Sequence, residues 1–226
     1  MDCKQVYSVS GSTREHVTIS FTVNAAGQMV PPRGVFAGKR DMAKHKLKDL
    51  PKDGKSGEWK YSYTENGWVK QHTFLDIIQD LGDFIKKEQI PTPVLIFIDG
   101  ASCHYSLEIS KLCKVLGIQP LLLRPNTTHL TQALDLTYYS SLKAGFKRAK
   151  ELWQRMPGNI GNSLNKYSII ALVHSTTEAI LRDKPDLIGR GFLKAGIFPW
   201  SSTAHNSERT APSQVGVSEI LLLISS

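Results

Sequence analysis

Residues 93–104 read PVLIFIDGASCH and residues 124–135 read RPNTTHLTQALD, and these two stretches decide the fold class. The first is a continuous apolar run that ends in Asp99, a pattern typical of a strand buried on both faces of a sheet. The second follows another apolar strand, predicted over residues 118–123, and closes with Asp135. Folds for phosphoryl transfer place one carboxylate at the mouth of a buried strand and another beyond the next strand to bind divalent metal ions.

Each of these carboxylates also has a simpler explanation. Asp99 followed by Gly100 after a strand is a turn signature, and Asp135 is placed to cap the helix that follows it. Their joint placement favours a metal site over either explanation taken alone. Phosphoryl transfer on nucleic acids commonly uses two Mg²⁺ ions about 3.5 to 4 Å apart, which prefer oxygen ligands. Asp99 and Asp135 supply two of these ligands.

Two further polar residues lie close to these acids in the sequence. His104 follows Asp99 by five positions, and it either orients a ligand, contacts a phosphate or is a structural histidine. Gln132 is a candidate hydrogen-bond donor to the metal ligands rather than a ligand itself.

The segments around the two stretches alternate between strands and helices. Strands are expected at residues 5–9, 16–25 and 34–37, and helices at residues 68–87, 106–116, 136–156, 167–182 and 186–194. This order predicts an α/β fold with a mixed sheet flanked by helices. We assign residues 1–156 to the core, 157–200 to a C-terminal helical extension and the Ser-rich residues 201–226 to a flexible tail.

The net charge of +8 suits a polyanionic partner, because Lys and Arg displace condensed counterions from phosphates. Residues 38–65 form a basic insertion, which is either a solvated loop or a loop that contacts DNA. Lys143, Lys147 and Lys150 lie on one face of the helix predicted at 136–156 and are candidates for nucleic-acid contact.

The composition also excludes several classes of protein. Cys3, Cys103 and Cys113 contain no CxxC pair, so neither a zinc site nor a disulfide framework is indicated. The chain has no secretory signal at its start, and no apolar stretch approaches the roughly 20 residues that span a bilayer. We therefore expect a soluble intracellular protein without a membrane partner.

The two opening stretches resemble the pogo/Tigger branch of the DDE transposases, also called the DDE superfamily endonuclease domain. The pattern of that family is an apolar strand, Asp, a nearby His, and then LPxxTTHxxQPLD. Here Ala133 stands in place of the Pro of QPLD, and Arg124 in place of the Leu before Pro125. Further landmarks of the resemblance are the segments at residues 15–18, 24–27, 31–32, 66–68 and 192–199. The resemblance covers about residues 5–200.

This resemblance implies a ribonuclease H-like sheet, a nuclear location, and Mg²⁺ or Mn²⁺ as cofactor. It makes Asp99 and Asp135 the second and third catalytic acids and metal ligands. The first acid of the family lies on an upstream strand at the centre of the sheet, and only four residues precede Gln5 here. We therefore expect an N-terminally truncated domain without its first, central strand. Either residues 5–9 fill that gap or the chain is marginally stable.

Together these observations predict a transposase-derived DDE domain that binds DNA, mostly through phosphates, and does not cleave strands. Two alternatives remain open. One is a Mg²⁺-dependent endonuclease that recruits a third acid from elsewhere in the chain. The other is a protein-interaction domain or a remnant without function. The sequence identifies no protein partner.

Overall fold

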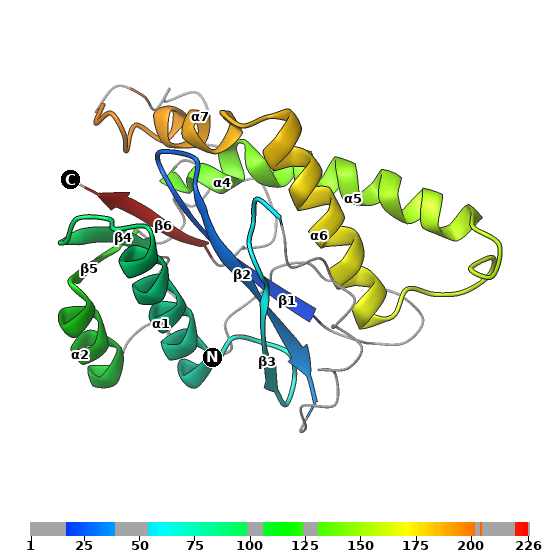
Figure 1. Ribbon diagram of the computed structural model, residues 1–226, viewed down its shortest axis with the longest axis horizontal. Helices are drawn as coiled ribbons and strands as arrows, with labels where there is room; N and C mark the ends of the chain where they lie inside the picture. The colour runs from blue at the N-terminus through cyan, green and yellow to red at the C-terminus, as the bar shows by residue number, and fades with distance from the viewer. Residues whose placement is uncertain are drawn as a thin grey trace.

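The computed structural model describes residues 17–38, 54–98, 106–123, 131–201 and 204, together with the backbone of residues 220–225. The strands are β1 (Val17–Asn24), β2 (Met29–Ala37), β3 (Lys60–Thr64), β4 (Val94–Ile98), β5 (Ile118–Leu122) and β6 (Ile220–Ser225). The helices are α1 (Gln71–Lys87), α2 (Leu107–Leu116), α4 (Ala133–Leu136), α5 (Tyr138–Arg155), α6 (Lys166–Asp183) and α7 (Leu187–Lys194). This alternation confirms the α/β prediction (Figure 1).

The six strands form one mixed sheet in the order β3-β2-β1-β6-β4-β5. β1 and β2 pair antiparallel through the turn at residues 25–28, and β4 and β5 pair parallel around α2. β2 runs through Pro31 and Pro32, where the register of β1 shifts, and β3 joins β2 from Arg33 onward. The two prolines, which have no N–H group, therefore lie where the ladder is interrupted.

The centre of the sheet is occupied by β6, which comes from the C-terminal end of the chain. β6 pairs parallel with β1, where Phe21 lies opposite Ile220, and antiparallel with β4, where Ile98 lies opposite Leu221. The sequence predicted a vacant strand position between these two neighbours, and the structure fills it. Residues 201–226, expected as a tail, thus contribute a strand that no local pattern could place, because its partners lie far away in the sequence.

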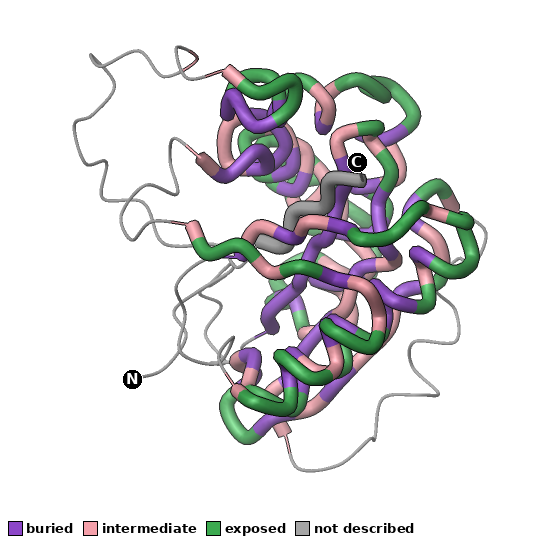
Figure 2. The backbone as a smooth tube through the Cα atoms, turned by 90° about the vertical axis from the view of Figure 1, so that its left-hand side faces the viewer, coloured by how far each residue is buried: buried purple, intermediate pink, exposed green. Residues whose placement is uncertain are grey.

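Helices cover both faces of the sheet. Val17, Ile19, Phe21 and Val23 alternate along β1 and pack with α4, α5, α6 and α7 in one buried cluster. A second cluster joins α1 and α2 to β2, β4 and β5. Figure 1 shows α1 and α2 together on one side and α4 to α7 on the other, and Figure 2 shows buried residues along the interior between them. Full burial of one Phe or Ile side chain stabilises a fold by roughly 1.5–3 kcal/mol, so both clusters contribute strongly.

The helices begin and end where the sequence gives signals. Ser106 caps α2, since its Oγ accepts a hydrogen bond from the Ile109 N–H at 3.1 Å. Gly117 ends the same helix with φ 68°, and a Cβ atom at this position would lie 2.9 Å from the Cβ of Thr92. Position 117 therefore requires glycine for two reasons, the left-handed backbone conformation and the close approach of Thr92.

The basic insertion differs from the expectation in its second half. Residues 60–64 of the predicted 38–65 insertion are β3, whose alternation Lys60-Tyr61-Ser62-Tyr63-Thr64 was obscured by the many charges before it. Residues 39–53 lie outside the described residues, as do the predicted strand at 5–9 and the landmark at 15–16.

Candidate functional site

Asp135 lies on α4, a four-residue helix whose backbone is tightly enclosed. The Asp135 N–H donates to the Gln132 carbonyl oxygen at 3.1 Å, and the adjacent Leu134 is fully buried. Gly191 of α7 packs directly against this turn. Position 191 requires glycine, because a Cβ atom there would overlap the Ala133 carbonyl oxygen. The Asp135 side chain is half-buried at this rigid position. The backbone that carries Asp135 is therefore fixed by close packing.

Asp99 and His104 lie outside the described residues, so the structure neither brings them to Asp135 nor separates them from it. It does place the end of β4, from which Asp99 follows directly in the chain. The Ile98 carbonyl oxygen accepts a hydrogen bond from the Leu123 N–H at 2.8 Å, so β4 and β5 end together. Phe97 packs against the cluster that contains Ala133 and Leu134 of α4. The end of β4 and the helix of Asp135 thus border one hydrophobic cluster.

No group of three or more His, Cys, Asp or Glu side chains that could hold a metal ion occurs in the described part of the chain. β6, the strand between β1 and β4, reads ILLLIS and brings no carboxylate to the centre of the sheet. Of the two predicted metal ligands, Asp135 is thus among the described residues, and Asp99 lies outside them.

Gln132 is fully buried at the residue before α4, and both polar atoms of its amide, Oε1 and Nε2, have no hydrogen-bond partner among the described residues. A buried polar group without a partner costs about 1–3 kcal/mol. A site that receives a hydrated ion offers such an amide its partners, so this orphaned group fits a metal site beside Asp135.

The three acids of α1 are engaged in ion pairs. Asp80 is 7% exposed, and its two carboxylate oxygens lie 2.7 Å from the Arg33 Nη2 and 2.7 Å from the Lys60 Nζ. Asp76 and Asp83 lie 3.5 and 3.7 Å from these same two cations. The network joins α1 to β2 and β3, and periodicity could not reveal it because the partners come from different elements.

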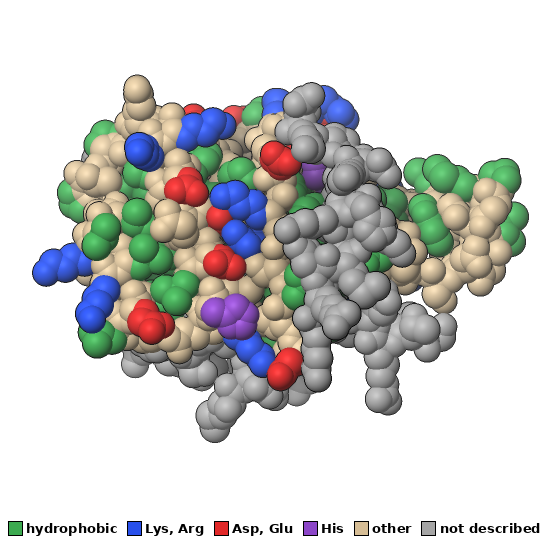
Figure 3. Space-filling view, turned by 60° about the horizontal axis from the view of Figure 1, so that its bottom comes forward, with side chains coloured by type: hydrophobic (Ala, Val, Ile, Leu, Met, Phe, Trp, Pro, Cys, Tyr) green, Lys and Arg blue, Asp and Glu red, His purple; other side chains and the backbone are tan. Residues whose placement is uncertain are grey.

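A cavity of about 770 Å³ opens beside this network, between α1 and the loop that precedes β3. Its charged lining residues are four cations and four acids, namely Arg33, Lys55, Lys60, Lys87, Glu58, Asp80, Asp83 and Glu88. On the face shown in Figure 3, Lys and Arg side chains likewise lie next to Asp and Glu side chains. This balance gives a phosphate backbone no net attraction, so the cavity is a poor candidate for nucleic-acid contact.

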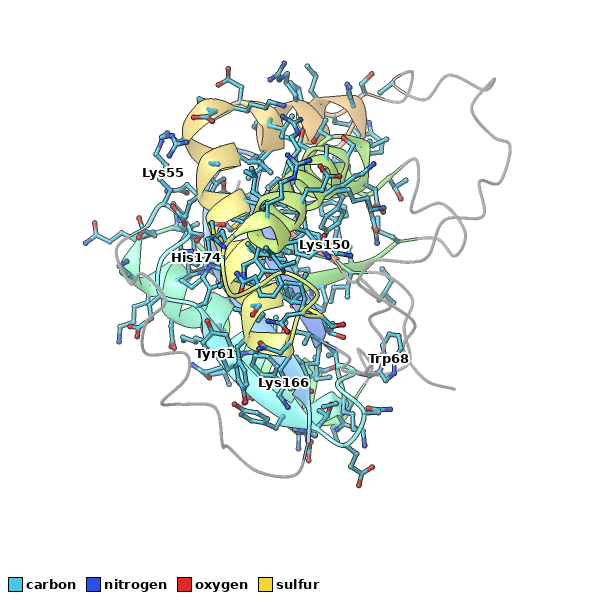
Figure 4. The ribbon with its side chains drawn as sticks, turned by 90° about the vertical axis from the view of Figure 1, so that its right-hand side faces the viewer. Lys55, Tyr61, Trp68, Lys150, Lys166 and His174 are labelled. Carbon is cyan, nitrogen blue, oxygen red and sulfur yellow. The ribbon has the colours of Figure 1, made fainter. Side chains whose placement is uncertain are left out.

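α5 has a very different charge. It carries five cations and one acid: Lys143, Lys147, Arg148, Lys150, Arg155 and Glu151. Lys143 and Lys147 are exposed, Lys150 is half-buried, and α5 begins three residues after Asp135. Its 18 residues extend about 27 Å at 1.5 Å per residue. The three predicted lysines therefore follow one helix that leads away from Asp135, and Figure 4 shows Lys150 and also Lys166 of α6.

Glu178 of α6 holds the segment that precedes β3. The Glu178 carboxylate accepts hydrogen bonds from the Lys55 N–H at 2.7 Å, the Ser56 N–H at 2.9 Å and the Ser56 hydroxyl. Burial alone would raise the pKa of Glu178, but these hydrogen bonds hold it below its usual value. Glu178 therefore stays charged and fixes the chain at Ser56.

His174 lies one helical turn before Glu178 and is 2% exposed. Its ring centroid lies 5.3 Å from that of Trp59, and its Nε2 atom has no partner among the described residues. Burial lowers its pKa, against an opposing effect of Glu178. Figure 4 shows His174 on α6 and Lys55 in the segment that Glu178 holds. The sequence held no signal for this group, because its members are separated by more than a hundred residues.

Comparison with known proteins yields a family match over most of the chain. The family model described as DDE superfamily endonuclease matches residues 14–192. A protein of Cochliobolus lunatus named MFS-type transporter clz9 is 29% identical over 144 residues, which are 64% of this chain and 15% of that protein. The chain thus spans about 15% of the length of the curated relative that it matches. No solved structure matches.

The name of that relative describes a membrane transporter. In the part of this chain that the structure covers, no helix combines the length and the apolar character needed to cross a bilayer.

Proposed function

The chain belongs to the DDE superfamily endonuclease family, and from this membership we propose that it is a transposase-derived domain that binds nucleic acid without cleaving strands. The resemblance to the pogo/Tigger branch narrows the proposal to a ribonuclease H-like sheet with Asp99 and Asp135 as its acids. It also leads us to propose a nuclear location. The partner is DNA, contacted mostly through its phosphates.

The proposal that the domain does not cleave strands depends on the sequence of the central strand of the sheet. The resemblance assigns the first catalytic acid to the strand beside β4, and β6 takes this position with the sequence ILLLIS. Two Mg²⁺ ions a few ångströms apart need several carboxylates, because the ions repel each other strongly. Asp99 and Asp135 suffice for one ion, which supports cation binding without strand cleavage.

We propose that this one ion is Mg²⁺, with Mn²⁺ as an alternative. Asp99 and Asp135 would hold it, and the orphaned amide of Gln132 would face its hydration shell. Such an ion supplies positive charge against a phosphate oxygen. The protein would contribute the Asp135 carboxylate from the buried turn at residues 132–135, and His104 either orients a ligand, contacts that phosphate or has a structural role.

Charge distribution supports α5 as the DNA-binding surface. Five of its six charged residues are cations, whereas α1 carries three acids and two lysines. α5 starts three residues after Asp135. A duplex bound along Lys143, Lys147 and Lys150 would therefore extend toward Asp135. Phosphate contacts by Lys side chains make binding salt-dependent and nearly independent of base sequence.

Fluorescence anisotropy with a labelled duplex at two salt concentrations tests this proposal. We expect affinity to fall steeply with salt, and the triple variant Lys143→Gln/Lys147→Gln/Lys150→Gln to reduce the log–log slope by about 0.9 for each lost phosphate contact. The matched control is Lys86→Gln/Lys87→Gln on α1, which we expect to leave the slope unchanged. Weak affinity that does not change with salt would contradict DNA binding.

The second candidate is a Mg²⁺-dependent endonuclease, which the family membership favours. It requires a third acid from elsewhere in the chain. Nicking of supercoiled plasmid in Mg²⁺ or Mn²⁺, lost in both Asp99→Ala and Asp135→Ala, would establish it. A purified chain that leaves the plasmid intact supports the inactive domain.

A further inference from the structure

Gln132 has an environment that its local fold does not explain. Its side chain is fully buried, and an uncharged carboxamide offers two N–H donors and one acceptor oxygen. Neither its Nε2 nor its Oε1 has a partner among the described residues. Buried amides in folded proteins are nearly always paired with protein atoms, water or an ion, so this amide needs a partner that the described residues do not supply.

The neighbouring Thr137 shows that this turn can satisfy its polar groups. The buried Thr137 hydroxyl donates to the Ala133 carbonyl oxygen at 3.2 Å. The Gln132 backbone is also used, since its carbonyl oxygen accepts from the N–H groups of Asp135 at 3.1 Å and Leu136 at 3.3 Å. The missing partner therefore concerns the Gln132 amide alone, and packing of the turn does not account for it.

Gln132 and Asp135 belong to the same short turn. Gln132 is the residue before α4 and has an extended backbone, and Asp135 is three positions later. The Gln132 side chain makes no capping hydrogen bond, so the helix that it precedes does not use its amide. The residues between them, Ala133 and Leu134, are fully buried apolar side chains. Asp135 is thus the acidic residue of the turn that begins at Gln132.

We propose that Gln132 is a positioning residue for a hydrated divalent cation held by Asp135, an inference that rests on the proposed metal site. The amide N–H and the amide oxygen would both pair with water molecules of the cation, because neither atom bonds the Asp135 carboxylate directly. Mg²⁺ and Mn²⁺ retain several waters when bound by few carboxylates, so such an acceptor is required. Residues that orient ligands in this way usually change metal affinity about 10- to 100-fold when removed.

The test is Gln132→Met in the full chain, because Met is also unbranched but has no strong hydrogen-bonding group. Mn²⁺ binding is measured by electron paramagnetic resonance, and the melting temperature is measured in EDTA. We expect Mn²⁺ affinity to fall about 10- to 100-fold. We expect the melting temperature in EDTA to stay equal or to rise, because the variant removes two unpaired buried groups.

Two controls separate this role from a structural one. Thr137→Val removes a paired buried hydroxyl, and we expect a lower melting temperature in EDTA with unchanged Mn²⁺ affinity. Asp135→Asn should abolish Mn²⁺ binding. Equal Mn²⁺ affinity in Gln132→Met and the parent chain overturns the role of Gln132 alone. A lower melting temperature of Gln132→Met in EDTA also overturns it, because the amide then has a partner without metal.

Failure of the metal site itself gives a different result. A parent chain that binds no Mn²⁺ overturns both the metal site and the role of Gln132. The salt-dependent binding of DNA by α5 is measured without metal, so this result leaves it unaffected.

Discussion

Ile98, the last residue of β4, lies opposite Leu221 of β6 in an antiparallel register. β6 pairs in parallel with β1 on its other side, so the two halves of the sheet are joined through a C-terminal strand. The stability of the whole fold should therefore depend on six residues at the end of the chain.

The substitution Leu222→Pro tests this dependence. Proline removes a ladder N–H and does not fit a central strand, and the carbonyl oxygen left unpaired costs about 1–3 kcal/mol. For a domain of this size we expect a fall in melting temperature of about 2 to 12 °C. Leu222→Val is the matched control, because it keeps the N–H and favours strands. Equal melting temperatures of the two variants would show that residues 220–225 do not pair in solution.

Asp80 gives a second prediction about stability. Asp80→Ala removes the carboxylate 2.7 Å from the Arg33 Nη2 and leaves Arg33, whose side chain is 11% exposed, with the more distant Asp76 at 3.5 Å. Removing one partner of a buried ion pair costs roughly 3 kcal/mol, and since Asp76 offsets part of this we expect about 2–3 kcal/mol, to which the Lys60 contact at 41% exposure adds little. The control Asp83→Ala removes a side chain that is 59% exposed and should cost below about 1 kcal/mol. Urea denaturation measures both, and equal costs would contradict a buried network.

These two cases show where sequence patterns succeed and where they fail. β4 and α2 were predictable because an apolar run and an apolar periodicity ending at Gly117 are local signals. β6 was not, because a six-residue apolar run carries no information about which strands it will pair with. The ion pairs of Asp80 on α1 were not predictable either, because its partners, Arg33 and Lys60, belong to two different strands.

The candidate site divides in the same way. Asp135 was singled out by a motif, and its place at a rigid turn is a tertiary feature that depends on the close approach of α7 at Gly191. The burial of Gln132 also needed the structure, since its position before α4 resembles an ordinary polar cap. The position of Asp99 relative to Asp135 stays a prediction.

Stability should fall as the pH falls from 7 to 5, because of His174. Burial lowers the pKa of His174 below its ordinary value of 6.5, so the unfolded chain takes up a proton before the folded chain does. Proton uptake then favours unfolding, and the effect begins below about pH 6.5. Glu178, whose pKa is also lowered, adds a second loss below its usual value of 4.5.

Thermal melts across this pH range check the prediction. His174→Leu should show a smaller loss between pH 7 and pH 5, since the titrating group is gone. The control His72→Gln changes an exposed histidine and should melt with the pH profile of the parent chain. A parent profile that is flat from pH 7 to pH 5 would count against a buried, neutral His174.

Gly191→Ala should damage the fold at the turn that carries Asp135. The added methyl group would overlap the Ala133 carbonyl oxygen, which is backbone and cannot rotate away. Overpacking of this kind typically costs about 1–3 kcal/mol, more than the gain of up to about 1 kcal/mol from replacing a helical Gly by Ala. Gly189→Ala on the same helix meets its nearest atom at 3.3 Å and should be tolerated better. Urea denaturation that ranks Gly191→Ala as the more stable variant would contradict the close contact.

The last prediction concerns sequence preference in DNA binding. If Lys147 and its neighbours on α5 contact phosphates, they carry no information about base identity. We therefore expect Lys147→Glu to weaken binding by the same factor for two duplexes of equal length and unrelated sequence. Competition titrations at one fixed salt concentration measure this factor, because affinity for DNA has no meaning without the salt concentration. A loss confined to one duplex would show that α5 reads bases, and it would replace phosphate contact with groove recognition as the role of this helix.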